Sequence, residues 1–157
     1  MVKLTHVDSL GKAKMVDIGG KSRTSREARA SCFIRLSPTA LRLVRENKIS
    51  KGDVLNTAVI AGIQGAKQTS DLIPLTHPIP LDFVNIETDI MKTGIKIVSR
   101  IRTEAKTGAE MEALTGVAAA ALTVYDMVKA VDKNAQITRL QLDFKSGGKS
   151  GVYRRKK

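Results

Sequence analysis

Hydrophobic and polar side chains alternate along four stretches of the chain. The first runs from Ala28 to Leu36, the next two cover residues 84–90 and 95–101, and the last covers residues 140–144. This alternation is the period of a β-strand with one buried face and one exposed face. Because only a short turn around Gly94 separates the two middle stretches, we expect them to form an antiparallel hairpin.

Three further stretches repeat their hydrophobic residues every three or four positions, as amphipathic helices do. A short helix is predicted to start at Pro38, directly after the N-capping residue Ser37. A second helix runs from the cap Asp53 to about Lys67, and the longest one follows Gly108.

The predicted order is strand, helix, helix, strand, strand, helix, strand. This order is typical of an α+β ferredoxin-like sandwich, in which helices cover one face of an antiparallel sheet. We expect a single domain over residues 1–157, with a mobile N-terminal arm (about residues 1–14) and a mobile C-terminal tail (about residues 146–157). Apolar residues on the other side of the strands, such as Phe83 and Val98, predict self-association through the bare sheet face.

Composition limits the partners of this chain. Its formal net charge of +12 favours a polyanionic ligand such as a phosphate. The single cysteine, Cys32, excludes an internal disulfide, and the first residues lack a secretory signal, so we expect a cytoplasmic protein. No apolar run approaches the roughly 20 residues that span a bilayer, and we expect no membrane insertion.

The segment from Lys145 to Gly151 combines two lysines with glycines that let backbone N–H groups approach an anion. It is not a P-loop, because that motif needs a glycine where this chain has Asp143 and a helix for which too few residues remain. Two readings stay open here: a phosphate-binding loop, or a solvated tail that leads into the basic residues 154–157.

The long helix carries Asp126 and Lys129 three residues apart, hence side by side on its surface. They could form an acid–base pair or an ordinary surface ion pair. Glu112 lies fourteen residues earlier, about 21 Å along a helix. If both carboxylates serve one reaction, they belong to a pocket shared by two subunits or to opposite ends of a long ligand.

His77 lies in a stiff proline-rich loop and could hydrogen-bond a base, move a proton, or serve the structure alone. Lys51 precedes the predicted helix cap, where an anion is favoured, or it is simply solvated. The two histidines and one cysteine are too dispersed for a zinc site, so we expect no metal bound by the protein.

The chain also carries a series of longer motifs: KGDVL (51–55), AGI (61–63), AKQTSDLIPLTHP (66–78), TGAEMEALT (107–115), ALTVYDMVKAV (121–131) and KSGGKSG (145–151). Together they resemble the cyclic pyranopterin monophosphate synthases, the molybdenum cofactor biosynthesis protein C family. The resemblance implies a hexamer, a trimer of dimers with sites between subunits. It also implies that cyclised dihydro-GTP (3′,8-cyclo-7,8-dihydroguanosine 5′-triphosphate) is converted to cyclic pyranopterin monophosphate with release of diphosphate.

The same resemblance assigns roles to individual residues. Asp126 would be the catalytic acid–base residue, and Lys129 would set its ionisation. The residues implied to contact the substrate are Leu75, Thr76, His77, Met111 and Glu112. Those implied to bind the triphosphate are Lys51, Lys67, Lys145 and Lys149. No cofactor is required, although magnesium carried by the substrate phosphates stays open.

Two features depart from the family: Thr76 stands where we expect a cysteine, and the tail is basic where relatives are often acidic. The main alternative function is an RNA-binding sheet, which the net charge would favour. Only 3% of the residues are aromatic, and Phe144 is predicted to face inward, so we do not expect a nucleic-acid partner, although the basic tail leaves such a contact open. A non-catalytic subunit, the third reading, would leave Asp126 and Lys129 without a shared task.

Overall fold

The computed structural model describes residues 10–156, so the first nine residues of the predicted arm lie outside it. Within this range the chain forms five strands and four helices. In order they are β1 (Thr24–Arg35), α1 (Pro38–Arg45), α2 (Val54–Lys67), α3 (Thr69–Leu72), β2 (Phe83–Ile90), β3 (Gly94–Ala105), α4 (Glu110–Val128), β4 (Gln136–Ser146) and β5 (Tyr153–Arg154).

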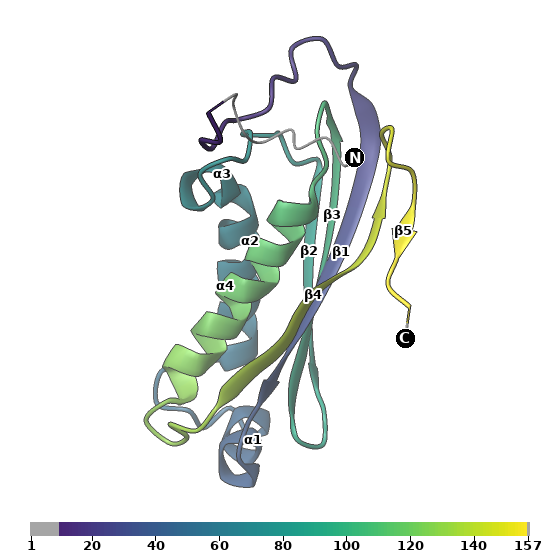
Figure 1. Ribbon diagram of the computed structural model, residues 1–157. Coiled ribbons are helices and arrows are strands. Elements are labelled where there is room, and N and C mark those ends of the chain that lie inside the picture. The colour runs from purple at the N-terminus through teal and green to yellow at the C-terminus, as the bar shows by residue number, and fades with distance from the viewer. Residues whose placement is uncertain (1–9, 157) are drawn as a thin grey trace.

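The strands form one antiparallel sheet in the order β2-β3-β1-β4-β5. Helices α2 and α4 pack against one another and cover one face, while the other face carries no helix in the described part of the chain (Figure 1). This arrangement confirms the predicted ferredoxin-like sandwich. Every predicted strand and helix is present, and the structure adds α3 and β5.

Small residues allow α2 and α4 to lie close together. A Cβ atom added to Gly62 would come within 3.0 Å of the Gly116 carbonyl oxygen, and one added to Gly65 within 2.5 Å of the Ala119 side chain. By length and composition α4 could cross a bilayer, but 56% of that stretch is buried inside the protein. It is packed as the central helix of the core.

The register of β4 explains one wrong prediction. Leu142 pairs with Ala30, whereas Phe144 pairs with Arg29, so Asp143 is an extra residue in β4. Such a bulge changes the face to which the following side chain points. Phe144 therefore lies on the bare face of the sheet, where the Arg29 guanidinium is 5.2 Å from its ring centroid, and not in the core as its alternation predicted.

All three phenylalanines face the bare side, each beneath an arginine. Arg102 lies 4.4 Å from the ring of Phe83, and Arg139 lies 5.5 Å from that of Phe33. The inward position of Phe144 no longer argues against RNA binding. Arginine side chains, however, already occupy the ring surfaces on which bases would stack.

Candidate active site

The residues singled out in the sequence gather at the two ends of α4. At its start, the proline-rich loop brings Leu75, Thr76 and His77 against Met111 and Glu112. At its last turns, Asp126 meets Lys51 and Lys129. The two groups lie about 21 Å apart along the helix axis, given a rise of 1.5 Å per residue.

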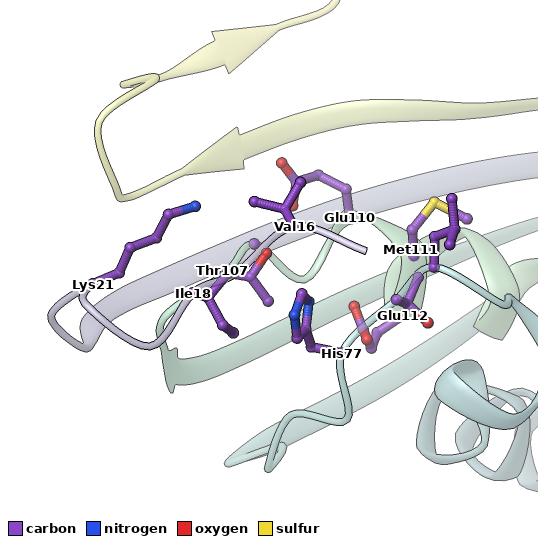
Figure 2. A pocket seen from close by; sticks show the side chains of 11 residues that line it. Val16, Ile18, Lys21, His77, Thr107, Glu110, Met111 and Glu112 are labelled. Carbon is purple, nitrogen blue, oxygen red and sulfur yellow. The ribbon is translucent and has the colours of Figure 1, made fainter. Parts of the chain in front are cut away.

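A cavity of about 340 Å³ opens at the start of α4, and we call it the helix-start pocket. Its walls come from the segment before β1, the proline-rich loop and the first turn of α4 (Figure 2). The segment before β1 supplies Val16, Ile18 and Lys21, while His77 and Glu112 come from the other two segments. The Thr76 hydroxyl donates to the Ile73 carbonyl oxygen at 2.8 Å, which fixes the turn before His77.

Glu112 is the buried acid of this pocket. Only 4% of the residue is exposed, and its Oε2 atom has no hydrogen-bond partner within residues 10–156. Burial raises the pKa of Glu112 to about 7, its own backbone N–H partly opposes the shift, and the charge of Glu110 adds to it. Near neutral pH the carboxyl can therefore offer a ligand either a donor or an acceptor.

A second, larger cavity of about 800 Å³ adjoins the first, and we call it the loop pocket. The two cavities share Lys21, Thr107, Gly108 and Glu110, so one elongated ligand could extend through both. The cationic side chains that line the loop pocket are Lys21, Arg26, Lys106 and Lys149. Four cations around one cavity make it suited to a polyphosphate.

The glycine-rich segment forms one wall of the loop pocket. Gly147 and Gly148 have φ angles of 94° and 72°, a region that side chains disfavour. A Cβ atom at Gly147 would also lie 2.3 Å from the backbone carbonyl oxygen of Ser25 in β1. Glycine is therefore needed both for the turn and for its close approach to β1, which favours the phosphate-binding interpretation over a merely solvated tail.

Lys145 connects this segment to the start of α4. Its Nζ lies 3.0 Å from Glu110 Oε1 and donates to the Ser150 hydroxyl at 3.0 Å. Glu110 lines both cavities, so the contact couples the glycine-rich segment to the wall between them.

The opposite end of α4 is an open cluster of three charges. Asp126 Oδ1 lies 2.7 Å from Lys129 Nζ, and its Oδ2 accepts from Lys51 Nζ at 2.6 Å. Hydrogen bonds from Lys129 and then Lys51 lower the pKa of Asp126 to about 2, and Asp126 in turn raises the pKa of Lys129. At neutral pH this carboxylate is ionised, with two ammonium groups beside it and 53% of its side chain exposed.

The structure divides the lysines that the sequence grouped together. Lys149 lines the loop pocket, and Lys145 forms an ion pair with Glu110 in its wall. Lys51 instead belongs to the Asp126 cluster at the far end of α4. Lys67 ends α2 and lines neither cavity.

Three cationic residues of the loop pocket escaped the sequence interpretation: Lys21, Arg26 and Lys106. The Arg26 guanidinium donates to the carbonyl oxygens of Ala105 and Lys106, which joins the start of β1 to the end of β3. No motif marks these residues. The antiparallel pairing of β1 with β3 brings Arg26 close to Lys106, and the Lys106 ammonium donates to the Gly19 carbonyl oxygen at 2.7 Å, which places the segment of Lys21 beside them.

Metal ligands are not clustered in the described range. No group of three or more His, Cys, Asp or Glu side chains within residues 10–156 could hold a metal ion. Cys32 is buried, which raises the pKa of its thiol to about 12, and its sulfur lies 3.6 Å from the Val117 carbonyl oxygen.

Comparison with known proteins identifies similar chains. The sequence model of the MoaC family matches residues 15–148. A protein of Streptomyces griseus named cyclic pyranopterin monophosphate synthase is 52% identical over 153 residues, covering 98% of this chain and 86% of the relative. Proteins with the same name from Thermomicrobium roseum and a Methylobacterium species are each 52% identical, covering 99% and 98% of this chain and 95% and 97% of the relatives.

Proposed function

The chain belongs to the MoaC family, and from this premise we propose that it is a cyclic pyranopterin monophosphate synthase of molybdenum cofactor biosynthesis. It would convert 3′,8-cyclo-7,8-dihydroguanosine 5′-triphosphate into cyclic pyranopterin monophosphate and diphosphate. The observation that carries the proposal is the pair of joined cavities, one with a buried acid and one with four cations.

The guanine-derived ring system would lie in the helix-start pocket. A purine-like ring offers both donors and acceptors at its edge, and Glu112 can match either because its pKa is about 7. His77 adds a second group that can donate or accept, while Val16, Ile18 and Leu75 supply apolar contact. Met111 also lines this pocket.

The triphosphate would then extend past Glu110 into the loop pocket. There a sugar hydroxyl attacks the phosphorus atom nearest the ribose, the bond to the outer two phosphates breaks, and diphosphate leaves. Lys21, Arg26, Lys106 and Lys149 would offset the charge that develops on the leaving group. No resident cofactor is needed, and magnesium would enter only as a companion of the substrate phosphates.

Asp126 and Lys129 would move the protons. At neutral pH the Asp126 carboxylate is unprotonated and the Lys129 ammonium is protonated, so the first can accept a proton and the second can donate one when a reacting group is held against them. Since about 21 Å of helix separates Asp126 from Glu112, the two cannot reach one sugar–pterin unit from the same subunit. We therefore propose that Asp126, Lys129 and Lys51 complete the pockets of a neighbouring subunit.

This requirement supports a homo-oligomer, and we propose the hexamer, a trimer of dimers, that the family resemblance implies. The bare sheet face, with its three phenylalanines beneath arginines, offers one surface for subunit contact. We also propose a cytoplasmic location, in keeping with a nucleotide-derived substrate and a buried, reduced Cys32.

A direct assay tests the activity. The purified protein is supplied with the cyclised dihydro-GTP, and diphosphate and the fluorescent oxidised pterin are followed in parallel, with GTP as the control substrate. We expect both products from the cyclised compound and neither from GTP. Diphosphate release without the pterin would contradict the proposed rearrangement, and sedimentation at the assay concentration checks the hexamer.

A further inference from the structure

The chain folds back onto the sheet at Tyr153 and Arg154. Strand β5 pairs antiparallel with the end of β4, with Phe144 opposite Arg154 and Lys145 opposite Tyr153 (Figure 1). The glycine-rich segment is therefore the turn of a β-hairpin, attached to the sheet at both ends. The sequence pattern predicted no strand in this part of the tail.

Two arginines fasten this short strand. The Arg154 guanidinium stacks 4.7 Å from the centroid of Phe144, on which Arg29 of β1 also stacks. Arg155 donates its backbone N–H to the Asp143 carbonyl oxygen and its Nε–H to the Leu142 carbonyl oxygen, both at 2.9 Å. Because a two-residue strand has little stability of its own, these side-chain contacts carry much of its attachment.

The same hairpin presents two groups to the loop pocket. Lys149 and Ser150 line the cavity from within the turn, and the Gly151 N–H donates to the Gly148 carbonyl oxygen at 3.3 Å to close it. The Ser150 hydroxyl also accepts a hydrogen bond from the Lys145 ammonium. A segment anchored at both ends samples far fewer conformations than one with a loose end.

We propose that Arg154 and Arg155 are positioning residues of the loop pocket, which hold the glycine-rich turn in its ligand-binding conformation by fastening β5 to β4. They would act through Lys149 and Ser150 and need not touch the ligand. The inference rests on the proposed function, because it assigns the loop pocket to the triphosphate. It gives the basic tail a task inside the subunit in place of the nucleic-acid contact that the sequence left open.

The test compares two double variants that each remove two positive charges and one arginine–phenylalanine stack. Arg154→Leu/Arg155→Met removes the stack of Arg154 on Phe144 and the side-chain hydrogen bond of Arg155 to Leu142. The control Arg35→Met/Arg102→Leu removes the stack on Phe83, which lies on the same bare sheet face, and an exposed charge at the far end of β1, neither of them at the loop pocket. Sedimentation checks that both variants keep the wild-type oligomer, because that face is also the proposed subunit contact.

Three measurements follow for each variant. We expect the ligand-binding conformation of the glycine-rich turn to fall to about a tenth of its population in Arg154→Leu/Arg155→Met. KM for the cyclised substrate and Kd for inorganic triphosphate should then both rise about tenfold. The value of kcat should change less than about twofold, because substrate saturates the pocket. Amide hydrogens of residues 147–151 should exchange faster in the first variant than in the control. Equal values in the two variants would overturn the proposal.

A charge-preserving variant separates fastening from long-range attraction. Arg154→Lys/Arg155→Lys keeps both charges but lacks the planar group that stacks and donates in a fixed geometry. It should retain most of the defect, and wild-type KM and Kd in this variant would show that charge alone matters. If the wild-type protein fails to turn over the substrate, the proposed function fails, whereas triphosphate binding and amide exchange still decide the role of the two arginines.

Discussion

The two ends of α4 each present a carboxylate, and their surroundings drive the two pKa values in opposite directions. Glu112 at the start is 4% exposed, and its Oε2 has no hydrogen-bond partner in the described chain. Asp126 near the end is half exposed and receives two lysine ammonium groups. Burial raises the first pKa to about 7, and the lysines lower the second to about 2.

This contrast separates two tasks that one carboxylate could not combine. A group with a pKa near 7 can share a proton with the edge of a bound ring, whereas a carboxylate with a pKa of about 2 stays unprotonated near neutral pH and accepts a proton only transiently, from a reacting group held against it. The first end has a cavity and the second lies open, so the second end acquires an enclosed environment only from another subunit. The open second end therefore adds to the separation of about 21 Å as a reason to place the two carboxylates in a site shared by two subunits.

The largest effect is expected from Asp126→Asn, which keeps the size of the side chain but removes its charge. We expect the turnover rate to fall by about 10²–10⁴-fold, the usual contribution of a positioned acid–base group. The matched control is Glu46→Gln, which removes a carboxylate from the exposed ion pair with Lys48 at 2.9 Å. Similar rates in the two variants would reduce the Asp126 cluster to a surface ion pair.

Mixed oligomers test whether the two ends of α4 in one site come from different subunits. Asp126→Asn subunits keep an intact helix-start pocket, and His77→Ala/Glu112→Gln subunits keep an intact Asp126 cluster. If each site takes one end from each of two subunits, random reassembly of equal amounts restores about a quarter of the sites. We expect activity well above that of either parent after mixing under mild dissociating conditions. No recovery would place both ends of the site in one subunit.

Much of the fold could be predicted from the sequence, because its strands and helices follow simple hydrophobic periods. The exceptions have local causes. Bulges shift the register of β4, which shortened the predicted strand and gave Phe144 the wrong face. Strand β5 was missed because two residues are too few to show a period, and the pairing depends on contacts with β4.

The candidate site was predictable only where motifs mark it. The proline-rich loop and the start of α4 were both singled out, and the fold brings them together. Arg26 and Lys106 were missed because their proximity depends on the pairing of β1 with β3. The position of Lys51 beside Asp126 was not predicted, since the sequence does not show that the segment before α2 meets the end of α4.

Folding stability gives a smaller but sharper contrast between the two ends. Because the pKa of Glu112 is raised from 4.5 to about 7 on folding, its stabilising contribution is complete below pH 4.5 and is lost as the pH rises through 7. Glutamine cannot ionise, so Glu112→Gln should gain roughly 1–3 kcal/mol relative to wild type between pH 5 and pH 8.5. Urea unfolding at fixed protein concentration measures the difference.

Asp126→Asn serves as the opposite case in the same experiment. The lowered pKa of Asp126 contributes stability above pH 3.8 that is lost only as the pH falls through about 2. Its difference from wild type should therefore stay constant between pH 5 and pH 8.5. A flat difference for Glu112→Gln as well would show that Glu112 does not titrate in the folded protein with a pKa of about 7.

The smallest effect is expected from Lys51→Met, which removes one of the two ammonium groups at Asp126. Lys129 remains and contributes the larger share, so the pKa of Asp126 should rise only part of the way toward its ordinary value of 3.8. The acidic limb of kcat/KM against pH reports the base of the unliganded enzyme and should move to higher pH.

Lys48→Met, which removes the lysine paired with Glu46, is the control and should leave the limb in place. An unchanged limb in Lys51→Met would mean that the ionisation of Asp126 does not set the acidic limb of the reaction, and the opposed protonation of the two ends of α4 would then lose its catalytic meaning.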